Sequence, residues 1–255
     1  KLSFSIQNWN NMSWDEFCDV AEATRMQGIE LYDIQGPVFR GKTSPSNPER
    51  AAATRRYLIS KNLKIPCVNT VNDFTTPEFI REFNECVTVA LNLGIEYIGI
   101  HTKNANMDEA AEALSMILDI VGERKVTVLV ETADAYAGTL HLRDLLNRFS
   151  DDRLAALWDM HTTTVVAKED AEETITNLGA YVKHVHLRDS DETGHYQLVG
   201  EGTLPIPDFM RALSSVDYDG FISLEWKIEW MEDLPCLDVI LPHFVNYMHR
   251  YESTR

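Results

Sequence analysis

The stretch VTVLVET, residues 126–132, is an apolar and β-branched run that contains an acid near its end. Short runs of this kind are typical of strands in the parallel sheets of α/β proteins. Because successive side chains of a strand point to opposite faces, Glu131 shares a face with Thr127 and Leu129. The stretch therefore predicts a buried strand that presents a carboxylate at its carboxyl end.

VTVLVET is the fifth of eight such runs, and each is followed by a stretch of helical period. Repeated βα units predict a parallel sheet covered by helices. Eight units in 255 residues fit a closed barrel better than an open sheet, and no linker divides the chain. We therefore predict an α/β fold, a single (β/α)8 TIM barrel over residues 1–255, with strands at 2–9, 28–33, 64–70, 97–103, 126–132, 154–161, 182–189 and 220–227.

Capping signals mark several helix ends. Ser13 and Glu16 have the spacing of a capping box ahead of the first helix. The longest loops are expected at about 34–47 and 190–204, and long loops within a compact fold are often functional. Glycines fall between a helix and the next strand at three positions where we expect a left-handed C-cap: Gly28, Gly94 and Gly220.

The composition, 44% hydrophobic and 25% charged, is that of an ordinary globular protein. A net charge of −17 argues against nucleic acid as a partner, because phosphate binding needs clustered Lys and Arg. It favours cations and small-molecule substrates. The chain shows neither a signal-peptide pattern at KLSFSIQNWN nor a membrane-spanning apolar run, so we expect a cytoplasmic protein with no membrane partner. The sequence leaves open whether the protein forms a homo-oligomer.

The cysteines lie far apart and lack the CxxC spacing of zinc or redox sites. They fall in segments that are expected to be helix or buried strand. We therefore interpret all four as small buried hydrophobic residues: Cys18, Cys67, Cys86 and Cys236.

The fifth to eighth predicted strands each carry a side chain that can bind a metal ion near the carboxyl end: Glu131 in VTVLVET, Asp159 in LWDMH, His186 in HVHLRDS and Glu225 in GFISLEWK. Barrel strands present their carboxyl ends at one mouth, where TIM-barrel enzymes have their active sites. One acid there can equally be a helix cap or a rim charge, but three crowded carboxylates need protonation, basic partners or a cation. These residues predict a divalent metal site that favours Mn²⁺, with Mg²⁺, Co²⁺ or Zn²⁺ as alternatives.

The motifs VLVET, LWDMH, HVHLRD, GEG and GFISLEW, in this order, resemble the xylose-isomerase-like sugar isomerases, epimerases and related dehydratases. The resemblance covers essentially the whole chain and is more specific for the superfamily than for a substrate. It implies that Glu131, Asp159, His186 and Glu225 bind one divalent ion. In the epimerase branch it also implies that Glu131 and Glu225 are catalytic and exchange the substrate proton from opposite faces.

Two positions depart from the family pattern. Many relatives carry a second histidine three residues after the sixth-strand aspartate, where this chain has Thr162. Strand parity instead directs His161 inward beside Asp159, as a substrate contact or a hydrogen-bonded rim residue. Ketose epimerases of the tagatose and psicose type carry an arginine six residues after the metal-binding histidine, and here that position is Glu192. The resemblance does not extend to that arginine.

Other side chains are directed toward the mouth by strand parity. Arg188 and Lys227 each lie two residues beyond a proposed ligand, where they would balance the three acids or bind a substrate carboxylate or phosphate. His184, one pleat deeper than His186, is expected to be a hydrogen-bonded member of the polar interior. The remaining candidates for substrate binding are His101 after the fourth strand, Glu30 on the second, and Trp9, which could stack on a sugar face.

These residues favour a metal-dependent isomerase or epimerase that acts on a ketose or related keto-sugar, phosphorylated or not. A lyase that dehydrates an inosose- or dehydroshikimate-like substrate is the alternative, because proton abstraction beside a carbonyl followed by loss of a hydroxyl needs only an added general acid. A phosphodiesterase like the apurinic endonucleases, which share this barrel, is disfavoured because its three-zinc site needs further His and Asp ligands. A catalytically silent barrel is disfavoured by the intact acid and histidine set.

Overall fold

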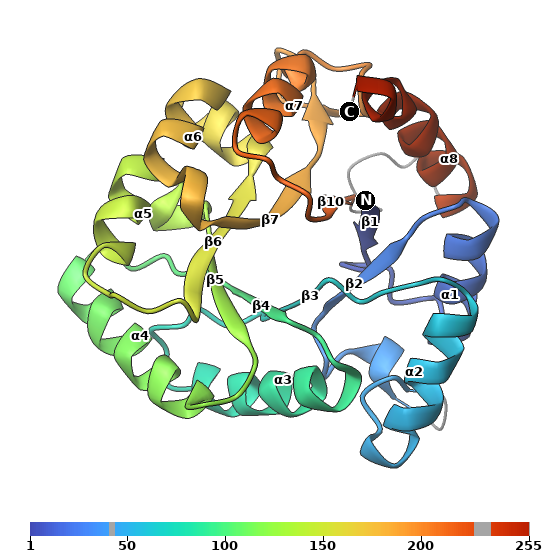
Figure 1. Ribbon diagram of the computed structural model, residues 1–255, viewed down its shortest axis with the longest axis horizontal. Coiled ribbons are helices and arrows are strands. Elements are labelled where there is room, and N and C mark those ends of the chain that lie inside the picture. The colour runs from blue at the N-terminus through green and yellow to red at the C-terminus, as the bar shows by residue number, and fades with distance from the viewer. Residues whose placement is uncertain (41–43, 227–235, 255) are drawn as a thin grey trace.

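The structure, a computed structural model, describes residues 1–40, 44–226 and 236–254. Eight parallel strands close into a barrel, and helices surround it on the outside (Figure 1). The barrel order is β1-β10-β7-β6-β5-β4-β3-β2, so the predicted (β/α)8 barrel is confirmed. Its strands are β1 (Leu2–Ser5), β2 (Gly28–Tyr32), β3 (Cys67–Asn69), β4 (Tyr97–Ile100), β5 (Thr127–Glu131), β6 (Leu154–Asp159), β7 (Val182–Leu187) and β10 (Ile222–Leu224).

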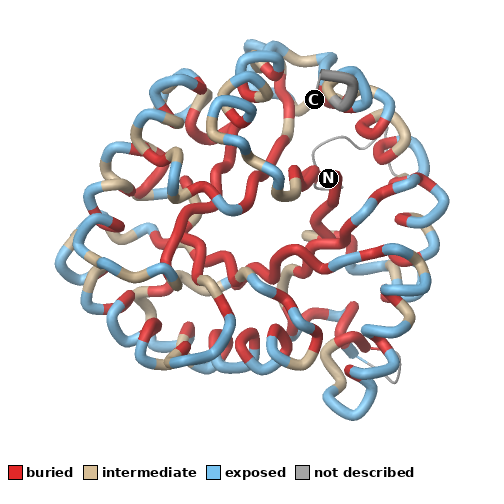
Figure 2. Tube along the Cα trace, viewed as in Figure 1, coloured by how far each residue is buried: buried red, intermediate tan, exposed pale blue. Residues whose placement is uncertain are grey.

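An α-helix follows each barrel strand and packs its apolar side on the barrel, which leaves the outer surfaces of the helices exposed (Figure 2). None of the helices in the described part of the chain has the length and apolar content needed to cross a membrane. The helices are α1 (Trp14–Ala23), α2 (Ala51–Ser60), α3 (Phe79–Leu93), α4 (Met107–Val121), α5 (Thr139–Leu146), α6 (Ala171–Leu178), α7 (Ile206–Ser215) and α8 (Leu237–Met248).

The strands are shorter than the sequence predicted, and most of the difference lies at their carboxyl ends. β6 stops at Asp159, and the chain then turns through Met160 and His161 into a π-helical turn, Thr162–Val166. Such turns are rare in proteins and often occur at functional sites. Several residues predicted as strand ends therefore lie in loops at the barrel mouth, where loop packing directs their side chains.

The capping predictions are partly confirmed. Ser13 and Glu16 form the reciprocal capping box of α1, and Gly94 ends α3 with a left-handed φ of 74°. The prediction was wrong for Gly28 and Gly220, whose backbones are not left-handed. Gly28 begins β2, where a Cβ atom would lie 2.8 Å from the ring of Phe221, so close packing requires glycine there.

The barrel interior has an apolar side and a polar side. Leu129, Ala155 and Leu157, from β5 and β6, cluster with Tyr97 of β4. The remaining strands contribute buried polar groups, although TIM-barrel interiors are usually filled by branched apolar residues. These groups include Ser3, Glu30, Asn69, His184, His186 and Ser223.

A short antiparallel hairpin, β8 (Asp189–Ser190) and β9 (Tyr196–Gln197), follows β7. The buried carboxylate of Asp189 organises the loop after it by accepting hydrogen bonds from backbone N–H groups of Ser190, Gly200, Gly202 and Leu204, at 2.8–3.2 Å. Because a carboxylate with four such donors fixes the path of the backbone, Asp189 holds this loop beside the barrel mouth.

Candidate active site at the carboxyl ends of the strands

All four predicted metal-binding residues line one cavity of about 480 Å³ at the carboxyl ends of the strands. Glu131 ends β5, Asp159 ends β6, His186 lies in β7 and Glu225 directly follows β10. These strands are neighbours around the barrel, so its closure brings the four side chains together. Their role as metal ligands remains a proposal.

His186 contacts a carboxylate with each ring nitrogen. Its Nε2 lies 2.6 Å from Oε1 of Glu30, and its Nδ1 lies 3.2 Å from Oε1 of Glu131. Burial alone would lower the pKa of His186, but Glu30 and then Glu131 raise it to about 10, so the ring is protonated when no cation is bound. An imidazole whose second nitrogen bonds to a carboxylate is the usual arrangement of a metal-binding histidine.

Glu30 lies beneath the cavity rather than in its lining, and its side chain is fully buried. Its Oε2 accepts a hydrogen bond from Nε2 of His184 at 2.7 Å, and the amide of Asn69 donates to Oε1. Burial alone would raise the pKa of Glu30, but His186 and His184 hold it well below its usual range. The structure thus places this predicted sugar contact as the anionic partner of two histidines.

Arg188 lies between Asp159 and Glu225 and contacts both carboxylates. One guanidinium nitrogen is 2.7 Å from Oδ2 of Asp159, another contacts Oε2 of Glu225, and Thr162 Oγ1 accepts a hydrogen bond at 3.1 Å. Burial alone would raise the pKa of Asp159, but Arg188 lowers it, helped by the backbone N–H of Thr162. This placement matches the charge-balancing role, one of the two that the sequence left open for Arg188.

His161 is buried and does not line the cavity. Its Nε2 lies 3.0 Å from Oγ of Ser190, and its ring lies 5.4 Å from that of Tyr196, both in the β8–β9 hairpin. Strand parity directed it inward, but β6 ends two residues earlier, so the π-helical turn sets its direction. It connects the mouth of the barrel to the loop that Asp189 holds.

We expect His161 to make the metal-free protein lose stability as the pH falls. Burial, followed by the charge of Arg188, lowers the pKa of His161 from 6.5 to about 4, so unfolding takes up a proton between these pH values. The free energy of unfolding should fall by up to about 3 kcal/mol more in the wild type than in His161→Gln between about pH 7 and pH 4. Urea unfolding in the presence of EDTA measures the free energy of unfolding of both proteins at the two pH values. Equal losses in the two proteins would contradict a neutral buried His161.

The other predicted substrate contacts are placed differently. His101 lines the cavity, where its Nε2 lies 3.1 Å from the carbonyl oxygen of Val71 and its Nδ1 lies 3.0 Å from Oδ2 of Asp134. Trp9 is buried outside the cavity lining and donates to the carbonyl oxygen of Trp226 at 3.0 Å. Lys227 lies outside the described residues. The substrate-binding roles of these residues remain proposals.

Sequence reasoning missed several polar residues that line the cavity. Ser5, Tyr32 and Asn69 lie in β1, β2 and β3, so strand parity could have found these three. Loop residues gave no such signal, because no strand sets the direction of their side chains. The missed polar residues are Ser5, Gln7, Tyr32, Asn69, Thr70, Lys103 and Asp134.

The family model described as "Xylose isomerase-like TIM barrel" matches residues 18–238. The chain belongs to this family. An uncharacterized protein of Methanocaldococcus jannaschii is 25% identical over 128 residues, a match that covers 48% of this chain. The match covers 44% of that relative, so this chain spans less than half of its length.

Solved structures of this barrel type superpose on nearly the whole chain. The IolI protein, solved with a bound zinc atom, has a TM-score of 0.81 at 14% identity and covers 99% and 98% of the two chains. D-Psicose 3-epimerase from Clostridium cellulolyticum H10, solved with D-tagatose, superposes with a TM-score of 0.75 at 13% identity, and the match covers 98% of each chain. The probable 3-DHS dehydratase AsbF from Bacillus anthracis superposes with a TM-score of 0.74 at 16% identity, and the match covers 97% of this chain and 98% of that one. At these identities the likeness shows a shared fold.

The donor types at the mouth of this xylose isomerase-like barrel suit a divalent cation, but no three of these four donor groups lie within 4.8 Å of one another while Arg188 contacts two of the acids. Asp159, Glu225 and Glu131 supply oxygen atoms, and Nδ1 of His186 is turned toward Glu131 while Glu30 holds its other nitrogen. Two of the three acids already converge on a cation, the guanidinium of Arg188. Oxygen-rich sites with one imidazole suit Mn²⁺ and related ions.

Proposed function

We propose that this protein is a metal-dependent isomerase or epimerase of a ketose or a related keto-sugar. The observation that carries this proposal is the placement of two carboxylates, Glu131 and Glu225, in one cavity together with Asp159 and His186. Glu131 ends β5 and Glu225 follows β10, and β6 and β7 separate these strands around the barrel. The two carboxylates can therefore approach a bound substrate from different sides.

The proposed chemistry is proton transfer at a carbon next to a carbonyl. A divalent ion bound by the four residues, which we infer to be Mn²⁺, would polarise the carbonyl and make that proton more acidic. One carboxylate, Glu225 or Glu131, removes the proton, and the other can return a proton to the opposite face. Two carboxylates acting on opposite faces give epimerisation, and return of a proton to the neighbouring carbon gives isomerisation.

The lining of the cavity favours a small hydroxylated substrate. Ser5, Gln7, Tyr32 and Asn69 contribute hydroxyl and amide groups to it, and these can donate to or accept from sugar hydroxyls. Lys103 also lines the cavity and is exposed, so a substrate phosphate or carboxylate would have a cationic partner. These groups support a ketose, with or without a phosphate, as the substrate class.

The proposal is tested by metal analysis of the purified protein and an NMR assay in D₂O with a panel of ketoses, ketose phosphates, inososes and dehydroshikimate. We expect deuterium to enter one substrate carbon only when the divalent ion is present. Exchange that continues in EDTA-treated protein, or no exchange with any ketose in the metal-loaded protein, would overturn the proposal.

We expect Arg188→Met to bind Mn²⁺ about tenfold more tightly than the wild type, a change of about 1.4 kcal/mol. The guanidinium contacts two proposed ligands, Asp159 and Glu225, so it competes with the ion for them. Isothermal titration of EDTA-treated protein measures the affinity, and Arg148→Met, which removes an exposed ion pair with Asp108, is the matched control. Weaker binding in Arg188→Met would assign Arg188 another role.

A dehydratase is the second candidate, and one observation favours it. His101 and Asp134 form a hydrogen-bonded pair in the cavity lining, and such a pair could protonate a leaving hydroxyl. The assay above separates the two reactions, because a dehydratase would release an unsaturated product from an inosose or dehydroshikimate. A ketose whose carbon skeleton and hydroxyl number stay unchanged would assign isomerisation or epimerisation.

A further inference from the structure

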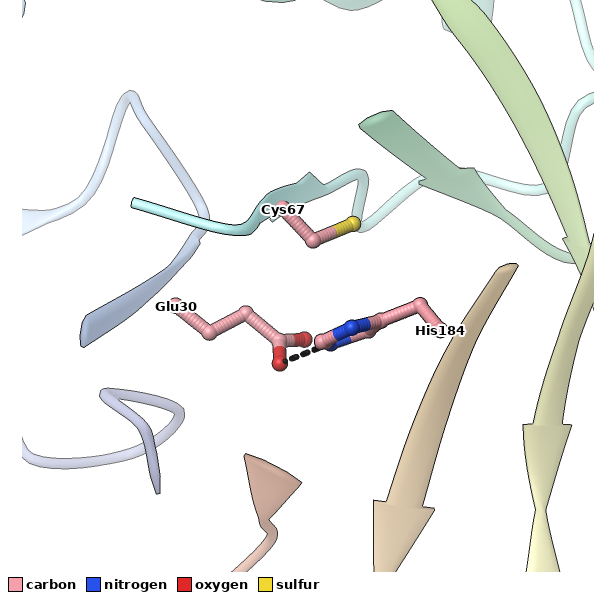
Figure 3. Close-up of side chains that lie close together, drawn as sticks. All are labelled: Glu30, Cys67 and His184. Atoms are coloured by element: carbon pink, nitrogen blue, oxygen red, sulfur yellow. Dashed lines mark hydrogen bonds and ion pairs between the residues drawn. The ribbon is translucent and has the colours of Figure 1, made fainter. Parts of the chain in front are cut away.

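A second group of metal-binding side chains lies deeper in the barrel, below the cavity. Donor atoms of Glu30 in β2, Cys67 in β3 and His184 in β7 lie within 4.8 Å of one another (Figure 3). All three residues are fully buried. No other group of three or more His, Cys, Asp or Glu side chains in the described part of the chain has this spacing. We propose that these three residues form a second metal site, separate from the mouth, that binds Zn²⁺.

The donor types and spacing suit this ion. Zn²⁺ accepts thiolate, imidazole and carboxylate ligands at about 2.0–2.3 Å, usually in a tetrahedron. Ligand atoms of such a tetrahedron lie about 3.3–3.8 Å apart. Side-chain movements that shift the donor atoms by about 1 Å would therefore bring all three within bonding distance of one ion. Nε2 of His184 and Oε2 of Glu30 are 2.7 Å apart, and the ion would take the place of the hydrogen between them, with neutral His184 then carrying its proton on Nδ1.

Charge also favours Zn²⁺ at this position. The carboxylate of Glu30 and the thiolate of Cys67 together offset the two positive charges of the ion, so the ion with its three ligands is neutral. Binding would form one bond from zinc to sulfur and release the thiol proton of Cys67 to solvent. Without the ion, burial raises the pKa of the Cys67 thiol well above its usual range, so the thiol is neutral.

Polar atoms on the same side of the interior lack a hydrogen-bond partner among the described residues: Nδ1 of His184, Oγ of Ser3 and Oγ of Ser223. Ser3 pairs in register with Ser223, and Ser223 pairs with His186, so these residues occupy neighbouring interior positions. Buried polar atoms usually have partners. These hydroxyls, and Nδ1 of His184 when Nε2 binds the ion, would need a further partner such as a buried water.

The site would connect strands that are not neighbours. β7 is separated from β2 and β3 around the barrel, so one ion held by all three strands would tie the barrel across its interior. Glu30 also contacts Nε2 of His186, and the ion would thereby fix the orientation of a residue in the mouth. We expect zinc loading to raise the Tm of the wild type by several degrees.

The test is metal counting on the full chain after loading with Zn²⁺ or Co²⁺ and removal of free ion. We expect two ions per chain in the wild type, one in Cys67→Ser and one in the double variant Asp159→Asn with Glu225→Gln. The Co²⁺ form should show a sulfur-to-cobalt charge-transfer absorption in the wild type and the double variant, and none in Cys67→Ser. Cys86→Ser removes an equally buried thiol in α3 and is the matched control.

Zinc X-ray absorption of the wild type gives a measurement that needs no variant, because it should show a sulfur ligand at about 2.3 Å. An all-oxygen and nitrogen zinc environment, or an unchanged ion count in folded Cys67→Ser, would overturn the deep site. The experiment tests the metal site at the mouth and the deep site independently of each other. If the double variant keeps every ion while Cys67→Ser loses one, the mouth is not a metal site and the deep site stands.

Discussion

Glu225→Gln is expected to lower kcat by about a hundredfold to ten-thousandfold, the range that general acid–base catalysis contributes. Glu225 lies in the cavity lining and its carboxylate faces Arg188 beside Asp159. Glutamine has nearly the same shape, but it cannot accept a proton and is a weaker ligand for a divalent cation. The measurement is deuterium incorporation in D₂O with the ketose that the wild type turns over.

Two controls separate the base from the ligand. Ion counts at saturating Mn²⁺ show whether Glu225→Gln still binds the metal, in which case the lost rate belongs to proton transfer. Glu172→Gln, an exposed residue in the first turn of α6, makes the same chemical change away from the cavity and should keep the wild-type rate. A Glu225→Gln rate within a factor of three of the wild type would remove Glu225 from the catalytic role.

Glu30→Gln should destabilise the metal-free protein by about 3–5 kcal/mol, the usual effect of breaking a buried ion pair from one side. The carboxylate lies 2.6 Å from Nε2 of His186 and 2.7 Å from Nε2 of His184, and all three side chains are buried. Without the anion, the protonated ring of His186 would lose its main partner in the interior. Urea unfolding in EDTA measures the change, and Glu172→Gln is again the control.

The same substitution should weaken metal binding at the mouth by about tenfold to a hundredfold, because partners of metal-binding histidines contribute on that scale. Isothermal titration with Mn²⁺ measures this effect in Glu30→Gln, in which the three acids of the mouth, Glu131, Asp159 and Glu225, are intact. A stability loss below about 1 kcal/mol would mean that His186 is not held as an ion pair. Unchanged Mn²⁺ affinity would mean that the orientation of His186 does not depend on Glu30.

The barrel could be predicted because its signals are local. Each apolar run and each helical stretch shows its own periodicity, and the number of βα units leaves few ways to close a parallel sheet. The gathering of Glu131, Asp159, His186 and Glu225 followed from one rule, that parallel strands present their carboxyl ends at the same mouth. The structure brings all four into one cavity.

Side-chain direction beyond the strands could not be predicted in the same way. Parity applies only while the chain stays in the sheet, and β6 stops at Asp159, so His161 turned toward the hairpin instead of the cavity. Trp9 lies four residues past the end of β1 and packs into the core. Cys236 was predicted to be buried but is half-buried at the start of α8, whereas the other three cysteines are buried as predicted.

The barrel and the positions of the four strand-end side chains could be predicted from the sequence, because both follow from local periodicity and the direction of parallel strands. Which charges meet depended on the packing of the closed barrel. It placed Arg188 between Asp159 and Glu225, and Glu30 beneath His186 beside Cys67. These contacts join strands far apart in the sequence, and their geometry depends on how the closed barrel packs its interior.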